Sequence, residues 1–259
     1  MDLDGLDKNR LPQHVAIIMD RNGHWAQQRG KSRIEGHRRG KTSVRVIVEF
    51  SRKIGIRFLS LYAFSTENWL RPHDEVHALM GLLEHYLIAE QPKMMRYGIR
   101  LLSVGDRDRL PLGVRRTLED VISLTRENNR MTVILALSYS GKDEIVRMTK
   151  KLACDVRDGK CAPEDIDEEM IAAHMDTPEV PEPDLLIRTS GEMRVSNFYL
   201  WQIAYSELYV TPTLWPDFRE QEYLQALMEY QRRRRRFGRT DEQLVASMPS
   251  SVEAGGSKS

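Results

Sequence analysis

Short runs of almost continuous hydrophobicity are the feature that most constrains how this chain can fold. Five of them occur, at residues 14–19, 57–64, 99–105, 131–138 and 184–187, and residues 207–210 form a weaker sixth. A strand that is apolar at nearly every position has to be buried on both faces, which is typical of a parallel sheet. The sequence therefore predicts a central parallel sheet of about six strands.

Segments with helical patterns lie between these runs, including residues 40–53, 75–90, 111–127 and 141–158. Alternation of strands and helices predicts an α/β fold, with helices flanking the sheet and right-handed crossovers. The helix at 75–90 has an apolar stripe that Leu82 and Ile88 make wider than one core face requires. Such a stripe most often packs into a core, and the alternative is that it lines a lipid channel.

The chain shows one domain and a polar tail. Its 259 residues fit one large domain or two small ones, and we find neither an internal repeat nor an interdomain linker. We predict a single domain over residues 1–240, ending with an amphipathic helix that stops at Gly238. Residues 241–259 are small and polar and are predicted to be disordered.

Composition excludes several classes of function. A net charge of +1 gives no overall field that attracts nucleic acid, so we expect no nucleic-acid partner. Cys154 and Cys161 have no metal-ligand partners nearby, which favours a reduced, cytoplasmic setting. No apolar run approaches the roughly 20 residues that span a bilayer, and the first residues lack the apolar core of a signal peptide. We expect a soluble protein, with peripheral contact at a membrane left open.

Polar residues follow three of the predicted strands. In open α/β sheets, ligands bind beyond the carboxyl ends of the strands, so these loops are expected to meet. The first contains Asp20, Asn22, Gly23, His24, Trp25, Arg29, Lys31, Arg33 and His37; the second contains Ser65, Glu67, Asn68, Trp69 and Arg71; the third contains Arg188, Ser190, Gly191, Arg194 and Ser196. Arginine forks, small hydroxyls and exposed backbone amides are groups that bind phosphate. The sequence predicts a site for a phosphorylated ligand.

Each of these residues also has a simpler explanation. Asp20 could cap a helix, Trp25 and Trp69 could be packing residues, and arginines after one strand are usually solvated. The arginines at 232–236 most simply complement the dipole at a helix end. Three such loops at one edge favour the ligand site. Neither a GxGxxG after a strand nor a GxxxxGK[ST] is present, so a dinucleotide fold and a P-loop are unsupported.

Four long motifs carry a resemblance to a known family. The stretches HVAIIMDRNGHWA, GHRRG, LYAFSTENWLRP and DLLIRTSGEMRVSNFYLWQIAYSELYVTPTLWPDF occur in this order between about residue 12 and Gly238. They resemble the cis-prenyltransferases, in particular the bacterial undecaprenyl diphosphate synthases. That family lacks the DDxxD motif of trans-prenyltransferases, and this chain also has none.

The resemblance implies a homodimeric, Mg²⁺-dependent enzyme with a hydrophobic tunnel between the sheet and the helices. Such an enzyme adds isopentenyl diphosphate repeatedly to an allylic diphosphate such as farnesyl diphosphate. Each cycle makes a new cis double bond, and the product implied here is a medium- or long-chain polyprenyl diphosphate, the precursor of the undecaprenyl lipid carrier.

The motifs also imply roles for individual residues. Asp20 would be the essential carboxylate, Glu207 would complete the metal site, and Asn68 would accept a proton or position a substrate. Segment 236–238 is similar to a C-terminal RxG that reaches the neighbouring subunit. The substrate-binding residues would be Arg21, Asn22, Gly23, His24, Trp25, Arg33, His37, Ser65, Thr66, Glu67, Trp69, Arg71, Arg188, Arg194, Val195 and Ser196.

Two positions depart from the family's usual MDGNGRW or MDGNRRW. Arg21 replaces a glycine that could adopt a positive φ without strain, and His24 replaces an arginine. Because imidazole titrates near neutrality, we predict weaker binding of the allylic diphosphate than in typical members, improving as the pH falls towards about 6. The segment ALSYSG at 136–141 also differs from the bacterial ANYGG form, which bears on product length.

Two other functions stay open from the sequence. An apolar strand followed by aspartate also begins haloacid-dehalogenase-type phosphatases, but those require a second aspartate where this chain has Asn22. A non-catalytic partner subunit of a cis-prenyltransferase is the second. Such subunits tend to lose the residues that stand here as Asp20, Arg188 and Arg194.

Overall fold

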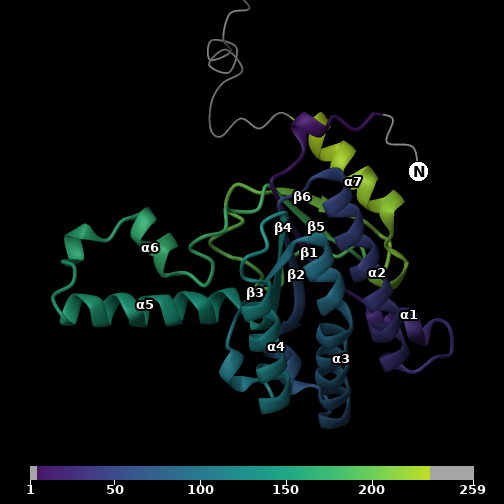
Figure 1. The fold of residues 1–259 in the computed structure, drawn as a ribbon, viewed down its shortest axis with the longest axis horizontal. Coiled ribbons are helices and arrows are strands. Elements are labelled where there is room, and N and C mark those ends of the chain that lie inside the picture. Colours follow the sequence, from purple (N-terminus) through teal and green to yellow (C-terminus); the bar gives the residue numbers. More distant parts are fainter. Residues whose placement is uncertain (1–4, 234–259) are drawn as a thin grey trace, which may run out of the picture.

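A computed structural model describes residues 5–233, and its central element is a six-stranded parallel sheet in the order β3-β4-β2-β1-β5-β6 (Figure 1). The predicted sheet is confirmed. Its strands are β1 (His14–Ile18), β2 (Phe58–Ser65), β3 (Ile99–Val104), β4 (Met131–Tyr139), β5 (Leu185–Arg188) and β6 (Glu207–Val210). The strand that follows β1 in the chain, β2, lies on one side of it, and the strand that follows β5, β6, lies on the other side of the sheet. The order in which strands are added to the parallel sheet therefore reverses between β1 and β5. Such a switch point opens a crevice at the carboxyl ends of the strands.

Helices occupy all four segments where they were predicted. The described helices are α1 (Asn22–Gln27), α2 (Arg33–Ile54), α3 (His73–Tyr97), α4 (Leu112–Thr125), α5 (Gly141–Arg157), α6 (Glu168–His174) and α7 (Glu220–Arg232). Both α2 and α3 are longer than expected, and α1 and α6 were not predicted. The end of the C-terminal helix at Gly238, the segment 236–238 and the tail at 241–259 lie outside the described residues.

Two glycines explain why the start of α2 was missed. Gly36 and Gly40 lower the helix propensity of residues 33–40. In the structure they let α2 pack directly against α1: a Cβ on Gly36 would lie 1.9 Å from the Asn22 carbonyl oxygen, and one on Gly40 would lie 2.3 Å from Asn22 Oδ1. Tertiary packing therefore outweighs local propensity, and it places the segment after β1 against the beginning of α2.

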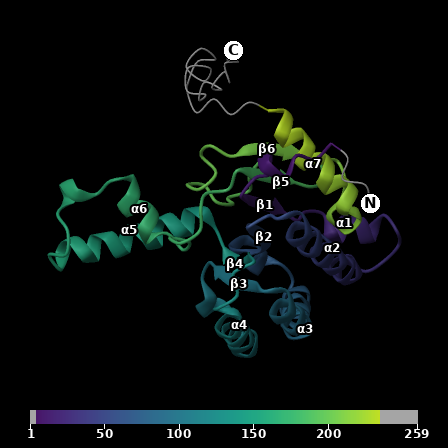
Figure 2. The ribbon, with the colours of Figure 1, turned by 45° about the horizontal axis from the view of Figure 1, so that its top comes forward.

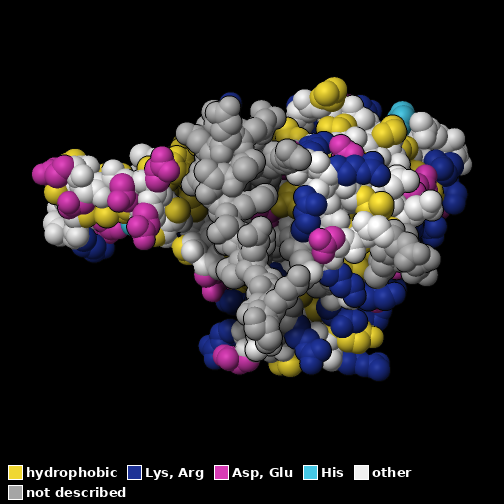
Figure 3. Space-filling model, turned by 90° about the horizontal axis from the view of Figure 1, so that it is seen from above, with side chains coloured by type: hydrophobic (Ala, Val, Ile, Leu, Met, Phe, Trp, Pro, Cys, Tyr) yellow, Lys and Arg dark blue, Asp and Glu magenta, His cyan; other side chains and the backbone are white. Residues whose placement is uncertain are grey.

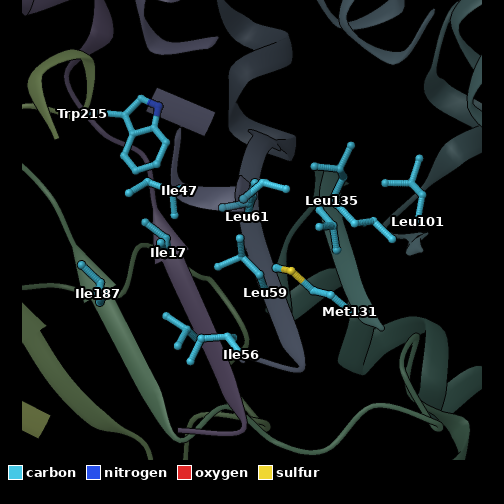
Figure 4. Close-up of a cluster of buried hydrophobic side chains, with 14 of the residues drawn as sticks. Ile17, Ile47, Ile56, Leu59, Leu61, Leu101, Met131, Leu135, Ile187 and Trp215 are labelled. Carbon is cyan, nitrogen blue, oxygen red and sulfur yellow. The ribbon is translucent and has the colours of Figure 1, made fainter. Parts of the chain in front are cut away.

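Strands β1, β4 and β5 are buried on both faces, as the continuous hydrophobicity predicted, whereas the edge strand β6 is partly exposed. On one face, Ile17, Leu61 and Leu135 of three neighbouring strands belong to one apolar cluster with Ile47 of α2 and Trp215 (Figure 4). Figure 2 shows α2, α3 and α4 side by side on this face. On the opposite face, alternate strand residues pack against Phe198 and Tyr199 rather than against a helix.

Helices α5 and α6 form an arm that projects from the sheet (Figures 1 and 2). Seen from above, acidic side chains gather on this arm, whereas lysines and arginines gather on the opposite part of the molecule (Figure 3). The arm holds its own small apolar cluster around Met148, Leu152 and Met175. Across residues 5–233, we find no helix with both the length and the hydrophobicity that crossing a membrane requires.

Candidate functional site: a cavity at the β1/β5 switch point

An ion pair between residues far apart in sequence spans the carboxyl ends of β1 and β5. Ile18 lies opposite Arg188 in the register of the two strands, and Asp20 follows two residues later. Asp20 Oδ2 accepts a hydrogen bond of 2.7 Å from Arg188 Nη2, while the Asp20 backbone N–H donates to Thr189 Oγ1 at 3.0 Å. The strand register thus fixes the distance between the carboxylate and the guanidinium.

Arg188 is the buried centre of the site. Its side chain is 5% exposed, compared with 33% for Asp20. Its Nη1 donates to Ser196 Oγ at 2.6 Å and to the carbonyl oxygen of Arg194, and its Nε has no hydrogen-bond partner within residues 5–233. A buried charge is retained only with hydrogen-bonded partners. The fork is therefore held rigidly by three of its five N–H donors.

Backbone strain gathers in the loops around this pair. Positive φ angles occur at Arg21 (67°), Ser190 (80°), Ser196 (46°), Asn197 (61°) and two further non-glycine residues. Side chains rarely adopt this conformation, and such residues concentrate at binding sites and active sites. The strain expected at position 21 is present: Arg21 precedes α1 in the left-handed conformation, which glycine adopts without strain.

A second carboxylate organises the side of the site formed by α2 and α3. Glu75 binds Arg33 Nε at 3.0 Å and Arg71 Nη1 at 3.1 Å, and its Oε1 lies 3.9 Å from His37 Nε2. Burial, followed by the charge of Arg71, lowers the pKa of His37 to about 4. Burial alone would raise the pKa of Glu75, but the hydrogen bond and charge of Arg33 hold it below its usual value. His37 is thus neutral near pH 7, and the cations here are the two arginines.

These groups surround a cavity of about 990 Å³. The predicted site residues that line it come from all three loops: Asp20, Arg21, Asn22, Gly23, His24, Arg33, His37, Ser65, Glu67, Asn68, Arg71, Arg188, Arg194 and Ser196. Its remaining wall is largely apolar and comes from α2, α3, β2 and β4, with Val44, Leu61, Phe64, Leu79, Met80, Leu82, Leu83, Tyr86, Leu135 and Leu137. The cavity therefore joins a cationic, polar part to an apolar part.

Glu207 does not join this site within one chain. It begins β6 opposite Leu185, whereas Arg188 lies opposite Val210, so Glu207 stands three residues, or roughly 10 Å, towards the other end of the sheet. Its carboxylate binds Arg233 Nη1 at 3.0 Å. Asp20 and Glu207 of the same chain therefore do not form a metal site. Asp20 follows the carboxyl end of β1, whereas Glu207 lies at the amino end of the parallel strand β6, and these ends lie at opposite edges of the sheet.

Four other predicted residues lie beside the cavity rather than in its wall. Trp25 is buried under the Arg29 guanidinium, 4.3 Å from the ring centroid. Trp69 donates from Nε1 to Ser138 Oγ at 2.9 Å and packs edge-on against Phe64. Both tryptophans thus take the packing role that the sequence left open. The other two are Thr66, which begins a short 3₁₀ helix, and Val195, which packs on the opposite face of the sheet.

Several functional candidates were not predicted from the sequence. Lys142 and Asn197 line the cavity, and Asn197 Nδ2 donates to Glu67 Oε1 at 3.1 Å. Glu75 and Glu192 bind the site's arginines. Lys142 follows β4, so the rule that ligands lie beyond strand ends could have found it. Nothing local distinguishes Glu75 in the first turn of a long helix.

Oxygen ligands for a metal are sparse. Within residues 5–233 no three His, Cys, Asp or Glu side chains converge as a metal cage would require. Asp20 is the carboxylate that faces the cavity beside Arg188, and Asn22 Oδ1 is buried there without a hydrogen-bond partner. This set excludes an all-protein cage among the described residues, but it fits an ion that takes most of its oxygens from elsewhere.

The geometry combines an α/β fold with an arginine-rich site and an apolar cavity. It defines a class of protein, namely enzymes or binding proteins for phosphates that carry an apolar chain. Comparison with known proteins narrows the class. A family model described as "Putative undecaprenyl diphosphate synthase" matches residues 18–238. The isoprenyl transferase of Chlorobaculum tepidum is 52% identical over 234 residues, covering 90% of this chain and 88% of that protein.

Two further relatives agree. The ditrans,polycis-undecaprenyl-diphosphate synthase ((2E,6E)-farnesyl-diphosphate specific) of Pasteurella multocida is 48% identical, covering 92% of this chain and 99% of its own. The crystal structure of lavandulyl diphosphate synthase from Lavandula x intermedia with dimethylallyl diphosphate superimposes with a TM-score of 0.87 at 38% identity, covering 89% of this chain and 99% of that one. The chain belongs to the undecaprenyl diphosphate synthase family of cis-prenyltransferases. These matches do not favour the two alternatives, a haloacid-dehalogenase-type phosphatase and a non-catalytic partner subunit.

Proposed function

We propose that this enzyme condenses isopentenyl diphosphate with an allylic diphosphate, farnesyl diphosphate being the expected primer, to make a medium- or long-chain cis-polyprenyl diphosphate. The product would be the precursor of the undecaprenyl lipid carrier. One observation carries the proposal: the Asp20–Arg188 pair, at 2.7 Å, stands in the cationic part of a cavity whose other part is largely apolar. A prenyl diphosphate has the same two parts, an anionic head and a hydrocarbon chain.

Two sets of cations suit the two diphosphates. Arg188, Arg194 and Ser196 would hold isopentenyl diphosphate, since the guanidinium forks match phosphate oxygens. Across the cavity, the backbone amides of residues 21–24, together with Arg33, His37 and Arg71, would hold the allylic diphosphate. Because His37 is neutral near pH 7, it would donate or accept a hydrogen bond rather than supply a positive charge.

Mg²⁺ fits the oxygens available. It commonly binds through one or two carboxylates plus substrate phosphates, so the Asp20 carboxylate with a diphosphate would suffice. When bound, the ion would neutralise negative charge that develops on departing pyrophosphate. Asp20 would hold it, and Arg188 keeps that carboxylate in place.

The reaction breaks the allylic C–O bond as pyrophosphate leaves, and the double bond of isopentenyl diphosphate forms the new C–C bond. A proton then leaves the condensing unit. Arg21, Arg33 and Arg71 would stabilise the leaving group, because fixed donors at developing charge lower the barrier. Asn68 lines the cavity and its Oδ1 accepts from the Ser65 backbone N–H at 3.2 Å. An amide is a weak base, so this geometry favours a positioning role over direct proton abstraction.

Oligomeric state and location are part of the proposal. Strand β6 lies at the edge of the sheet with Leu208 half exposed, and Tyr205 beside it is also exposed. An apolar strand edge of this kind supports pairing with a second copy in a homodimer. We expect a cytoplasmic enzyme that contacts the membrane only at its periphery, when the lipid product is released.

The test is direct. Purified protein is incubated with farnesyl diphosphate, labelled isopentenyl diphosphate and Mg²⁺, and the products are separated by chain length. We expect label in polyprenyl diphosphates, pyrophosphate release that depends on isopentenyl diphosphate, and loss of both with EDTA. Phosphate release from a simple phosphomonoester, or no incorporation by the purified chain, would contradict the proposal.

A further inference from the structure

One carboxylate spans the two loops that flank the Asp20–Arg188 pair. Glu192, in the loop after β5, forms ion pairs with Arg21 from the loop after β1 and with Arg194 from its own loop. Both arginines line the cavity. The hydrogen bond from Arg21 lowers the pKa of Glu192, followed by the hydrogen bond and charge of Arg194, so the carboxylate is ionised at neutral pH. In this state two cations of the site are occupied by a protein anion.

The exposure of these side chains shows where the bridge lies. Arg21 is 42% exposed and Arg194 is 62% exposed, whereas Arg188 is 5% exposed. The Glu192 bridge therefore stands at the outer, solvent-facing end of the polar part, and Arg188 lies deeper. A diphosphate that binds Arg188 and Arg194 together competes with Glu192 for the Arg194 guanidinium.

Glu192 also lies directly after two residues in the left-handed backbone conformation. It follows Ser190 and Gly191, whose φ angles are 80° and 75°. Unlike Glu75, which is fixed in the first turn of α3, Glu192 belongs to no helix or strand, although the two carboxylates are similarly buried, at 19% and 11% exposed. The arginine partners of Glu192 are exposed, and ion pairs of exposed groups are weak and screened by salt, so a diphosphate with more negative charge can displace Glu192.

We propose that Glu192 acts as an internal competitor for the diphosphate site, holding Arg21 and Arg194 until a substrate diphosphate displaces it. This rests on the proposed function, since it assigns regulation of affinity to the same site. Arginine at position 21 makes the competition stronger, because it gives the carboxylate a second partner from the opposite loop. Removing the charge at position 192 then releases both guanidinium groups for the ligand.

The experiment measures binding of inorganic pyrophosphate in the presence of Mg²⁺, by calorimetry, to wild type and to Glu192→Gln. We expect about tenfold tighter binding by the variant, and a smaller gain in an Arg21→Gly background, because one of the two ion pairs is then already absent. The gain should shrink as salt is added. Glu179→Gln is the matched control: it also removes a glutamate bound to an arginine, Arg100, outside the cavity.

The sign of the effect decides between competition and positioning. If Glu192 instead orients the arginines for the ligand, Glu192→Gln binds pyrophosphate more weakly, which overturns the proposal, as does equal binding or no binding by either protein. Thermal melting of each variant confirms that it is folded. Because the binding measurement needs no turnover, wild type that binds as expected but makes no polyprenyl product counts against the proposed function alone.

Discussion

The two ends of strand β1 carry polar residues that differ in how well their hydrogen bonds are satisfied. His14 stands at its amino end, and Asp20 follows its carboxyl end. At the amino end the buried polar atoms find protein partners: His14 Nδ1 bonds the Pro181 carbonyl oxygen at 2.6 Å, its Nε2 bonds Ser60 Oγ at 2.8 Å, and Ser60 also meets Tyr199 Oη at 3.0 Å. This end is closed and its network stabilises the fold.

At the carboxyl end, several buried polar atoms have no hydrogen-bond partner in the described part of the chain. Asn22 Oδ1, His37 Nε2, Arg188 Nε and Ser190 Oγ are buried without a hydrogen bond among the described residues. Most buried polar groups in proteins are satisfied, so a local surplus calls for a ligand, ion or water. The difference teaches that substitutions at the amino end should change stability, whereas those at the carboxyl end should change activity.

The largest effect is expected from Asp20→Ala. It removes the carboxylate proposed to hold Mg²⁺ and leaves the buried Arg188 without its partner, so the elongation rate should fall about a thousandfold. The measurement is incorporation of labelled isopentenyl diphosphate at saturating substrate. Asp217→Asn is the control, because Asp217 pairs with Arg29 on the surface and does not line the cavity. Elongation at more than a tenth of the wild-type rate in Asp20→Ala would contradict the assignment.

Arg188→Lys should have the next largest effect. Lysine keeps the charge but loses the fork that bonds Asp20, Ser196 and the Arg194 carbonyl oxygen. Charge-assisted hydrogen bonds contribute about 1.5–3 kcal/mol, so KM for isopentenyl diphosphate should rise roughly tenfold to a hundredfold. Arg115→Lys, at an exposed pair with Glu119, should leave KM unchanged. An equal KM in both variants would mean that Arg188 does not hold this substrate.

Sequence patterns predicted where the site lies, at the carboxyl ends of the strands, better than they predicted which side chains contact one another there. Continuous apolar runs gave all six strands, and the strand-end rule then gathered Asp20, Arg33, Arg71 and Arg188 correctly, because parallel strands place their carboxyl ends at one edge. The same rule does not gather Glu207, because it lies at the start of a strand, and only its motif suggested a metal role.

The remaining misses concern contacts that no local pattern encodes. Residues 33–39 of α2 contain a glycine that weakens the helix signal, yet packing on Asn22 requires it. Glu75 and Glu192 became visible only through the arginines that they bind. Pairing between distant side chains depends on the completed fold, so it is the part of a site that one sequence conveys least.

At the amino end, His14 should make stability depend on pH. Burial, offset in part by the Pro181 hydrogen bond and Asp184, lowers its pKa from 6.5 to about 4. The unfolded chain therefore binds more protons than the native state between these values, and stability is lost as the pH falls through this window. The loss should reach roughly 3 kcal/mol for this residue.

Urea unfolding of wild type and His14→Gln between about pH 7 and about pH 5 measures this dependence. The variant should be less stable at neutral pH and should show a shallower fall, while its KM values stay near those of wild type. A parallel fall in both proteins would show that other groups cause the acid sensitivity.

The smallest effect is expected from the pH response of His37, which shares the lowered pKa of His14 but lies at the other end of the sheet. Burial and the charge of Arg71 bring its pKa to about 4, so in the ligand-free protein its NMR signals should not titrate between pH 8 and about pH 5. His37→Asn should therefore raise KM for the allylic diphosphate by a similar, modest factor across that range, since a neutral hydrogen-bonding group is lost rather than a charge.

A midpoint near 6.5 in the His37 titration would contradict this expectation, because it would show that water or Glu75 relieves the burial. His14 serves as the internal reference. Its ring nitrogens both have protein partners, so adding pyrophosphate should leave its signals in place. The signals of His37, whose Nε2 has no hydrogen bond in the described part of the chain, should move. Signals that move equally at both ends of the sheet would mean that the ligand changes the whole fold, and the division between a stabilising end and a functional end of β1 would fail.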